Sequence, residues 1–321
     1  MKYSIVVPIY HDGYLADDLC NEIERVMQSY LDCDDITPDL ELIFVNDGSE
    51  DNSLIQLKAA LAKHTFVKLV DLSRNFGQHS AIACGLCQAR GNTVIRMNVD
   101  MQDHPSFIPI LLDHYKKTGA DLVVGQYDKR NSPLLDKITA ALYFRLFRGL
   151  TGFEVPKNTS PMRVMSRRFV NAYNSLSEKT RFPQGLDAWL GFEHECVNIE
   201  HRSRVDNRSS YNFTKRLSLA LSGAVYFSDR PIKFVAGGGL MLSILGFVIG
   251  LVIAGTKVLG VDYLPGYASL ASIGLIAMGL QLFSIGLIGL YVSKIFVEVK
   301  NRPIFIVKEI YTQRQRNNEV I

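Results

Sequence analysis

Short apolar runs and helical patterns follow one another along the first half of the chain. The apolar runs predict strands at residues 4–9, 41–46, 67–71, 93–98 and 121–125. Between them, apolar residues recur with helical spacing at residues 17–30, 52–63, 78–89 and 105–117. This alternation predicts an α/β fold with a mostly parallel sheet and helices on both of its faces.

Two long apolar runs near the C-terminus have a different character. No charged residue lies between Phe234 and Ala254, and none lies between Tyr263 and Ser293. A helix of about 20 apolar residues is long enough to cross a bilayer. The runs therefore predict two transmembrane helices, at about residues 232–255 and 266–293.

These runs divide the chain into three parts. We expect an α/β domain at residues 1–228, a transmembrane hairpin at 229–297 and a tail at 298–321. Two basic amphipathic segments, near residues 135–150 and 211–227, have the pattern of interfacial helices. For the first of them, an ordinary core helix with a solvated face fits the pattern equally well.

The chain has 35 Lys and Arg against 32 Asp and Glu, a net charge of +3, so no nucleic-acid partner is expected.

Charge near the apolar runs predicts the topology. Basic residues flank the predicted hairpin at Arg230, Lys233, Lys294, Lys300 and Arg302. The loop inside the hairpin carries only one basic and one acidic residue, so we expect both termini and the α/β domain to be cytoplasmic. The N-terminus has no signal-peptide pattern.

The predicted spans are rich in glycine. Gly246 and Gly250 form a G-x-x-x-G motif, which allows close packing of helices in lipid. Because two helices without internal charge are too few for a transport path, we expect them to anchor the domain and to build a homo-oligomer.

Polar residues stand at the ends of three predicted strands. Asp47 follows the second strand, Asn75 lies after the third and Asp100 lies after the fourth. Ligands of open parallel sheets bind beyond the carboxyl ends of the strands. This edge of the sheet is therefore the expected nucleotide site.

Four short segments carry a family resemblance, at residues 7–10 (VPIY), 45–49 (VNDGS), 74–77 (RNFG) and 98–103 (NVDMQD). Together with later segments such as 189–192 (WLGF), they resemble polyprenyl-phosphate glycosyltransferases of glycosyltransferase family 2. That group is similar to dolichol-phosphate-mannose synthase and to bacterial enzymes that glucosylate undecaprenyl phosphate. The resemblance implies a GT-A fold.

The resemblance also implies a reaction. A sugar from a nucleotide sugar, expected to be a UDP-sugar, is transferred with inversion to polyprenyl (undecaprenyl) phosphate for modification of cell-envelope glycans. The expected place is the cytoplasmic face of the bacterial inner (plasma) membrane.

Donor binding is expected at the strand ends. Asp47 can accept hydrogen bonds from a base or a ribose, Tyr10 offers the base an aromatic surface, and Gly77 lets the backbone approach the diphosphate. The full expected set is Pro8, Tyr10, Asp12, Asp47, Arg74, Asn75, Gly77 and Asn98.

A divalent metal ion is expected nearby, because the family uses an Asp-x-Asp pattern to hold one against the diphosphate. Here the pattern is Asn98-Val99-Asp100, so an amide replaces one carboxylate. Asp100 and Gln102 are the expected ligands of Mg²⁺ or Mn²⁺. A helix cap ahead of Pro105 is the alternative role for Asp100.

The family's acidic residue, often assigned as the catalytic base, is missing. Where related enzymes have Gly-Asp-Phe-Arg, this chain has Ser160-Pro161-Met162-Arg163. A lipid phosphate is largely ionised at neutral pH, since its second pKa is about 6, so it needs no base. It needs cations instead, and we expect Arg163 to act with Asp100 in catalysis. The expected ligands of the acceptor phosphate are Arg130, Lys137 and Arg208.

Other functions fit less well. Asn98 and Pro161 leave open a non-catalytic, nucleotide-binding membrane scaffold, and the donor motifs leave open a GDP-mannose-using enzyme. A processive polysaccharide synthase is disfavoured, because the chain lacks a Gln-x-x-Arg-Trp motif and has only two predicted spans.

Overall fold

The computed structural model describes residues 1–127, 149, 158–179, 181, 183–199, 230–259 and 266–313. The chain forms two compact units. The first comprises Met1–Lys137, Glu154–Ser210 and Arg302–Ile321, and the second comprises Ile138–Phe153 and Tyr211–Asn301. Arg130, Lys137 and Arg208 lie outside the described residues, as do both expected interfacial helices apart from Gly149.

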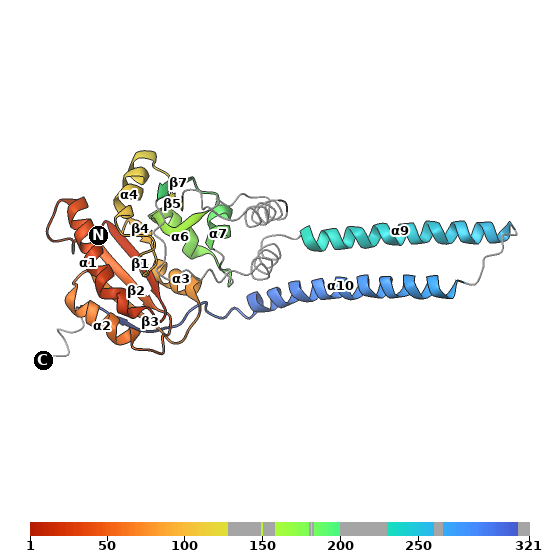
Figure 1. Cartoon of the computed structure of the whole chain (residues 1–321), viewed down its shortest axis with the longest axis horizontal. Helices are drawn as coiled ribbons and strands as arrows, with labels where there is room; N and C mark the ends of the chain where they lie inside the picture. The colour runs from red at the N-terminus through yellow and green to blue at the C-terminus, as the bar shows by residue number, and fades with distance from the viewer. Residues whose placement is uncertain are drawn as a thin grey trace. The chain divides into compact units, whose positions relative to one another are not determined.

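The described part of the first unit contains one sheet with the strand order β7-β5-β6-β4-β1-β2-β3-β8 (Figure 1). Its strands are β1 (Tyr3–Ile9), β2 (Leu40–Asn46), β3 (Val67–Leu72), β4 (Thr93–Arg96), β5 (Leu122–Tyr127), β6 (Thr159–Ser166), β7 (His194–Ile199) and β8 (Val307–Tyr311). Strand β1 is parallel to β2 and β4, β2 is parallel to β3, and β5 is parallel to β7. The predicted mostly parallel α/β sheet is therefore confirmed.

Two strands run antiparallel to their neighbours. Strand β6 lies between β4 and β5 and is antiparallel to both, and β8 is antiparallel to β3. Neither direction follows from the apolar pattern, because pairing depends on where the intervening chain returns to the sheet.

Helices cover both faces of the sheet. They are η1 (Gly13–Leu15), α1 (Ala16–Leu31), α2 (Ser53–Lys63), α3 (Gln78–Gln88), α4 (Phe107–Thr118), α6 (Arg167–Ser175) and α7 (Pro183–Trp189). Leu19 and Ile23 of α1 join Ile5 and Val7 of β1 in the main hydrophobic core. The alternate residue Val6 faces the other side, where it lies against Gly85 of α3. Strand side chains that point to either face are thus buried, as in a sheet covered by helices on both sides.

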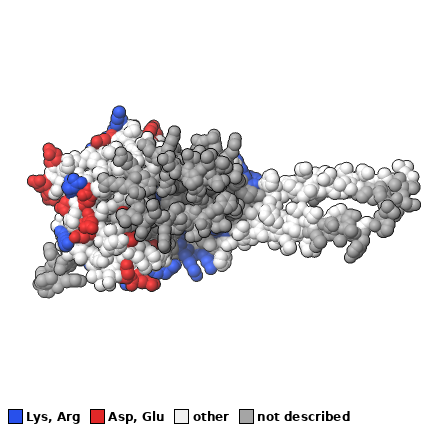
Figure 2. Space-filling model, in the orientation of Figure 1, with Lys and Arg blue, Asp and Glu red and all other residues white. Residues whose placement is uncertain are grey.

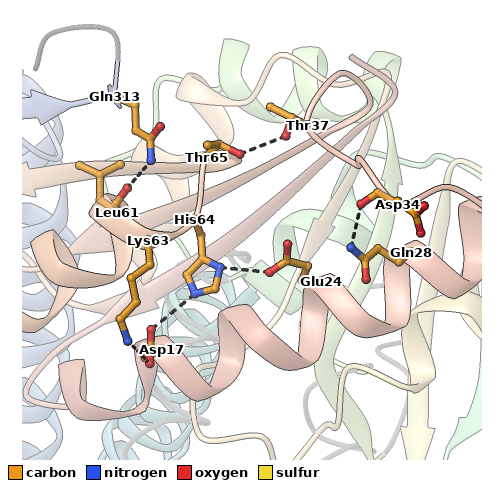
Figure 3. A network of polar contacts seen from close by, with 10 residues as sticks. All are labelled: Asp17, Glu24, Gln28, Asp34, Thr37, Leu61, Lys63, His64, Thr65 and Gln313. Atoms are coloured by element: carbon orange, nitrogen blue, oxygen red, sulfur yellow. Dashed lines mark hydrogen bonds and ion pairs between the residues drawn. The ribbon is translucent and has the colours of Figure 1, made fainter. Parts of the chain in front are cut away.

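A histidine ties α1 to the end of α2. His64 Nδ1 lies 3.1 Å from Glu24 Oε2, and its Nε2 lies 3.4 Å from Asp17 Oδ1 (Figure 3). Lys63 Nζ donates to the other oxygen of Asp17 at 2.7 Å. Because these contacts join α1 to the end of α2, the network has a structural role.

The C-terminal segment returns to the first unit. Strand β8 pairs with the edge strand β3, and Ser73 N donates to Ile306 O at 3.0 Å. Gln313 Nε2 donates to Leu61 O of α2 at 2.8 Å (Figure 3). Strand β8 therefore covers the sheet edge at β3 of its own chain.

The second unit contains two long helices, α9 (Arg230–Val258) and α10 (Tyr267–Val299). Their segments Ile232–Ile249 and Ile276–Val299 are long and apolar enough to cross a membrane, and none of either segment is buried. Figure 2 shows uncharged side chains along most of their described length, with basic residues at one end.

Asp121, directly before β5, offers a test of how an ion pair supports this fold. Its carboxylate accepts hydrogen bonds from Ser166 Oγ at 2.7 Å and from Arg168. Burial raises the pKa of Asp121, but the hydrogen bonds from Arg168 and Ser166 outweigh burial and hold the pKa below its usual 3.8. The carboxylate therefore stabilises the fold fully above about pH 4 and less as the pH falls through the folded-state value.

We expect Asp121→Asn to lower the free energy of unfolding by about 1–3 kcal/mol at pH 7, because buried Ser166 and the exposed Arg168 lose a charged acceptor. The melting temperature, followed by Trp189 fluorescence, is expected to fall by about 2–8 °C. Asp113→Asn is the matched control, since the Asp113 carboxylate is exposed and accepts a hydrogen bond from Tyr30 OH. Equal melting temperatures for both variants would contradict the assignment.

Candidate active site

A pocket of about 370 Å³ opens at the carboxyl ends of the parallel strands. Residues that follow β1, β2, β3 and β4 all contribute to it, as is usual for ligand sites of such sheets. Its lining consists of Pro8, Ile9, Tyr10, Asp12, Asp47, Asn75, Gly77, Gln78, Asn98, Val99 and Asp100. Eight of these are residues that the sequence analysis assigned to donor or metal binding.

Asp47 organises the floor of the pocket. The residue is 2% exposed, its Oδ1 accepts a hydrogen bond from Phe76 N at 2.8 Å, and its Oδ2 accepts one from Gly77 N at 2.9 Å. Burial raises the pKa of Asp47, and these two hydrogen bonds oppose that effect. Each oxygen retains a second lone pair, so Asp47 holds the loop after β3 and still offers acceptor capacity to a ligand.

Gly48 brings the β2 and β3 loops into contact. Its φ is +64°, and a Cβ at this position would lie 2.2 Å from the carbonyl carbon of Arg74. Only glycine fits, because any side chain would push the loop out of place.

Arg74 and Asn75 use their side chains differently. Asn75 lines the pocket, and its Oδ1 accepts a hydrogen bond from Gly77 N at 3.0 Å. Arg74 is exposed, lies over the Phe76 ring at 4.2 Å and does not line the pocket. Its expected contact with a donor diphosphate therefore requires its side chain to turn.

The expected metal ligands lie on the β4 side of the pocket. Asn98 Oδ1 accepts from Gln78 Nε2 at 3.2 Å, and Asp100 Oδ1 accepts from Gln102 N at 3.3 Å. Gln102 itself does not line the pocket. Asp103 is not part of this group, because Tyr127 OH and Ser160 Oγ donate to its two oxygens at 2.7 and 2.5 Å.

This donor set fits a metal ion that takes most of its ligands from a bound diphosphate. Within the described ranges, no group of three or more His, Cys, Asp or Glu residues could hold a metal ion by itself. Mg²⁺ commonly binds through one or two carboxylates together with phosphate oxygens and water. Asp100 provides the carboxylate, and the Asn98 amide oxygen is available beside it.

Arg163 occupies a different environment from the one expected. It lies on β6, is 4% exposed and forms an ion pair with Asp187 of α7. It does not line the pocket. Burial, with a smaller contribution from Arg96, lowers the pKa of Arg163 to about 9, so it remains charged at neutral pH.

Comparison with known proteins identifies the family. The model of the family described as Glycosyl transferase family 2 matches residues 4–173, which is more than half of the chain. The chain belongs to glycosyl transferase family 2. It is therefore a glycosyltransferase, and the non-catalytic scaffold considered above is set aside.

Several relatives are similar to this glycosyltransferase over nearly its whole length. The uncharacterized glycosyltransferase YkcC of Bacillus subtilis is 33% identical, over 97% of this chain and 94% of the relative. The SfII prophage-derived bactoprenol glucosyl transferase of Shigella flexneri is 32% identical, over 96% of this chain and 98% of the relative.

A solved structure supports the fold. Glucosyl-3-phosphoglycerate synthase from Mycobacterium tuberculosis aligns with a TM-score of 0.51 and 18% identity, over 71% of this chain and 80% of that chain. At this identity the likeness shows the fold alone, and together with the family it confirms the expected GT-A architecture.

Three residues near the site of this glycosyltransferase were not found from the sequence. Gln78 lines the pocket, and its position directly after Gly77 was an available signal. Arg96 shares the period-two alternation of Asn98 and Asp100, which was also visible. Asp187 had no signal, because only the fold brings α7 to β6.

Proposed function

We propose that this glycosyltransferase moves a sugar from a nucleotide sugar, a UDP-sugar, to polyprenyl (undecaprenyl) phosphate, with inversion at the anomeric carbon. The similarity to bactoprenol glucosyl transferases over nearly the full chain carries this proposal. The strand-end pocket and the two membrane-length helices support it, since the reaction joins a water-soluble donor to a lipid acceptor.

The donor occupies the pocket. Tyr10, which is 45% exposed, offers the base an aromatic surface, and Asp47 offers carboxylate oxygens to the base or ribose. Gly77, with φ of +93°, exposes backbone next to the diphosphate. Asp12 and Asn75 complete the polar wall.

Asp100 would hold Mg²⁺ or Mn²⁺, with the Asn98 amide and Gln102 as supporting groups. When bound, such an ion neutralises the charge that builds on the departing diphosphate. Asp100 would fix the ion's position, and Gln78 orients the Asn98 amide through its hydrogen bond.

The acceptor supplies its own nucleophile. A phosphate oxygen forms the new bond to the anomeric carbon while the bond to the nucleoside diphosphate breaks and UDP takes the electron pair. The phosphate monoester becomes a diester, and no proton has to be removed from a dianionic acceptor. Pro161 in place of an acid is compatible with this chemistry, since positioning and charge compensation replace a general base.

The membrane arrangement follows from charge. Arg230 and Lys233 precede the first span, and Lys294 and Lys300 lie at the end of the second, so we place both ends of the hairpin on the cytoplasmic side. The product is a lipid-phosphate-linked sugar at the cytoplasmic face of the bacterial inner membrane, for modification of cell-envelope glycans. The glycine-rich spans are proposed to support a homo-oligomer.

The proposal is tested with the purified full-length protein in lipid nanodiscs. Undecaprenyl phosphate and a panel of UDP- and GDP-sugars are supplied with Mg²⁺ or Mn²⁺, and lipid products are measured by mass spectrometry. The expected product forms with a UDP-sugar and requires the lipid phosphate. Transfer from GDP-mannose alone would overturn the donor assignment, and no lipid-linked sugar with any donor would overturn the function.

A further inference from the structure

Two arginines lie next to each other on the face of the sheet opposite the main hydrophobic core. Arg96 of β4 is the register partner of Arg163 of β6, and they are 8% and 4% exposed. Met97 and Val164, their neighbours along the strands, belong to the main core. Since side chains alternate between the two faces of a sheet, both guanidinium groups point to the opposite face.

The charges in this cluster are not balanced by the described residues. Arg163 forms an ion pair with Asp187, and the nearby Arg181 donates to the carbonyl oxygens of Tyr173 and Leu176. Within the part of the chain that the structure describes, the Arg96 side chain makes no hydrogen bond or ion pair, and its Nε is buried without a partner. A buried charge without compensation costs several kcal/mol, so it points to an anionic ligand.

The cluster adjoins the donor pocket. Strand β4 ends at Arg96, and Asn98, Val99 and Asp100, which follow it within four residues, line the pocket. Two residues along an extended chain span about 6.6 Å, which is within the reach of an arginine side chain. The guanidinium of Arg96 is therefore within reach of the edge of the pocket that Asn98 lines.

Two further observations concern the surroundings of the cluster. His79 directly follows the pocket residue Gln78. Desolvation lowers the pKa of His79, and the charge of Arg96 lowers it further. Pro161 lies two residues before Arg163 on β6 and carries no charge. No acid at position 161 repels an anion that approaches Arg96.

We propose that Arg96 binds the phosphate group of the acceptor beside the donor pocket. Arg163, which forms an ion pair with Asp187, adds positive electrostatic potential next to Arg96. This inference rests on the proposed function and assigns its acceptor site. The planar guanidinium can donate to two phosphate oxygens at once, which aligns the third oxygen for attack. A bound phosphate also explains why Arg96 is buried at a position where no described residue neutralises its charge.

The first experiment compares the steady-state kinetics of Arg96→Gln with those of the wild type in nanodiscs. The KM for undecaprenyl phosphate is expected to rise at least tenfold, as is usual for loss of a charge-assisted contact, while the KM for the donor stays within about twofold. An unchanged acceptor KM, or a rise in the donor KM instead, would overturn the assignment.

The second experiment measures binding without turnover. Inorganic phosphate is expected to raise the melting temperature of the wild type but not of Arg96→Gln, whereas UDP raises both. If no donor supports transfer and the phosphate effect still depends on Arg96, the proposed function fails while the anion site stands. If phosphate stabilises both proteins equally, the site itself is wrong.

A third measurement separates ligand binding from a structural role. Without ligand, Arg96→Met is expected to melt at or above the wild-type temperature, because an uncompensated buried charge is removed. Arg167→Gln is the matched control: Arg167 donates to the carbonyl oxygens of Ala89 and Gly91, so its loss should lower the melting temperature and leave the acceptor KM unchanged. An Arg96→Met variant that is as unstable as this control would contradict the proposal.

Discussion

Replacing Asp100 with alanine is expected to reduce the rate of sugar transfer about 10³-fold, which corresponds to about 4 kcal/mol of transition-state stabilisation. Asp100 is the pocket carboxylate that follows β4, and it would hold the proposed metal ion, which supplies charge compensation to the leaving diphosphate. Without this ligand the diphosphate must depart with less charge compensation. The measurement is kcat with saturating donor and lipid phosphate.

The metal role of Asp100 is separated from a role in folding by calorimetry of UDP binding. Mn²⁺ is expected to strengthen UDP binding by the wild type and to have no effect on Asp100→Ala, while metal-free UDP binding is similar in both. Asn98→Asp restores a second carboxylate and is expected to increase the Mn²⁺ effect. Asp34→Ala, at an exposed position of a loop, is the control. A full Mn²⁺ effect in Asp100→Ala would remove Asp100 from the metal site.

Replacing Gly48 with alanine is expected to abolish donor binding and to destabilise the first unit by about 2–4 kcal/mol. The added Cβ would overlap the backbone of Arg74 and Asn75, at 2.2 and 2.5 Å, and the residue would keep a φ of +64°. Because both positions are backbone, no side-chain rotation relieves the overlap, and strain adds about 1 kcal/mol or more. The loop that carries Asn75 and Gly77 must move, and UDP affinity falls with it.

Gly119→Ala is the matched control for this variant. Gly119 ends α4 with a φ of +71°, but an added Cβ there meets nothing within 4 Å. The control therefore carries the backbone strain without the overlap, and it should retain UDP binding with a loss of about 1 kcal/mol in stability. UDP affinity and melting temperature are measured for both, and equal values would show that the close approach at Gly48 is unimportant.

Most of the donor pocket could be predicted because its residues follow consecutive parallel strands. The carboxyl ends of such strands meet at one edge, so Asp47, Asn75 and Asp100 were expected to converge, and they line one pocket. The two membrane-length helices were equally visible, since a long apolar run without charge has few alternatives to a spanning helix.

The surroundings of individual charges could not be predicted in the same way. Arg163 belongs to a recognisable motif, yet its partner Asp187 lies 24 positions later on α7, and no local pattern relates the two. Asp47 was expected to face a nucleotide, but its oxygens also hold the backbone of Phe76 and Gly77. In each case the contact is made by a segment that is distant in the sequence. A sequence motif therefore identifies the residue but not the groups that it contacts.

The sequence by itself determined the α/β class, the strand-end location of the pocket, the two apolar helices and the family, because each depends on periodicity or on short local motifs. Only the tertiary structure decided that β6 and β8 run antiparallel, that β8 covers the edge of β3, and that Arg96 lies beside Arg163. These features depend on long-range strand pairing, whose register is set by packing of the whole sheet and leaves no signature in neighbouring residues.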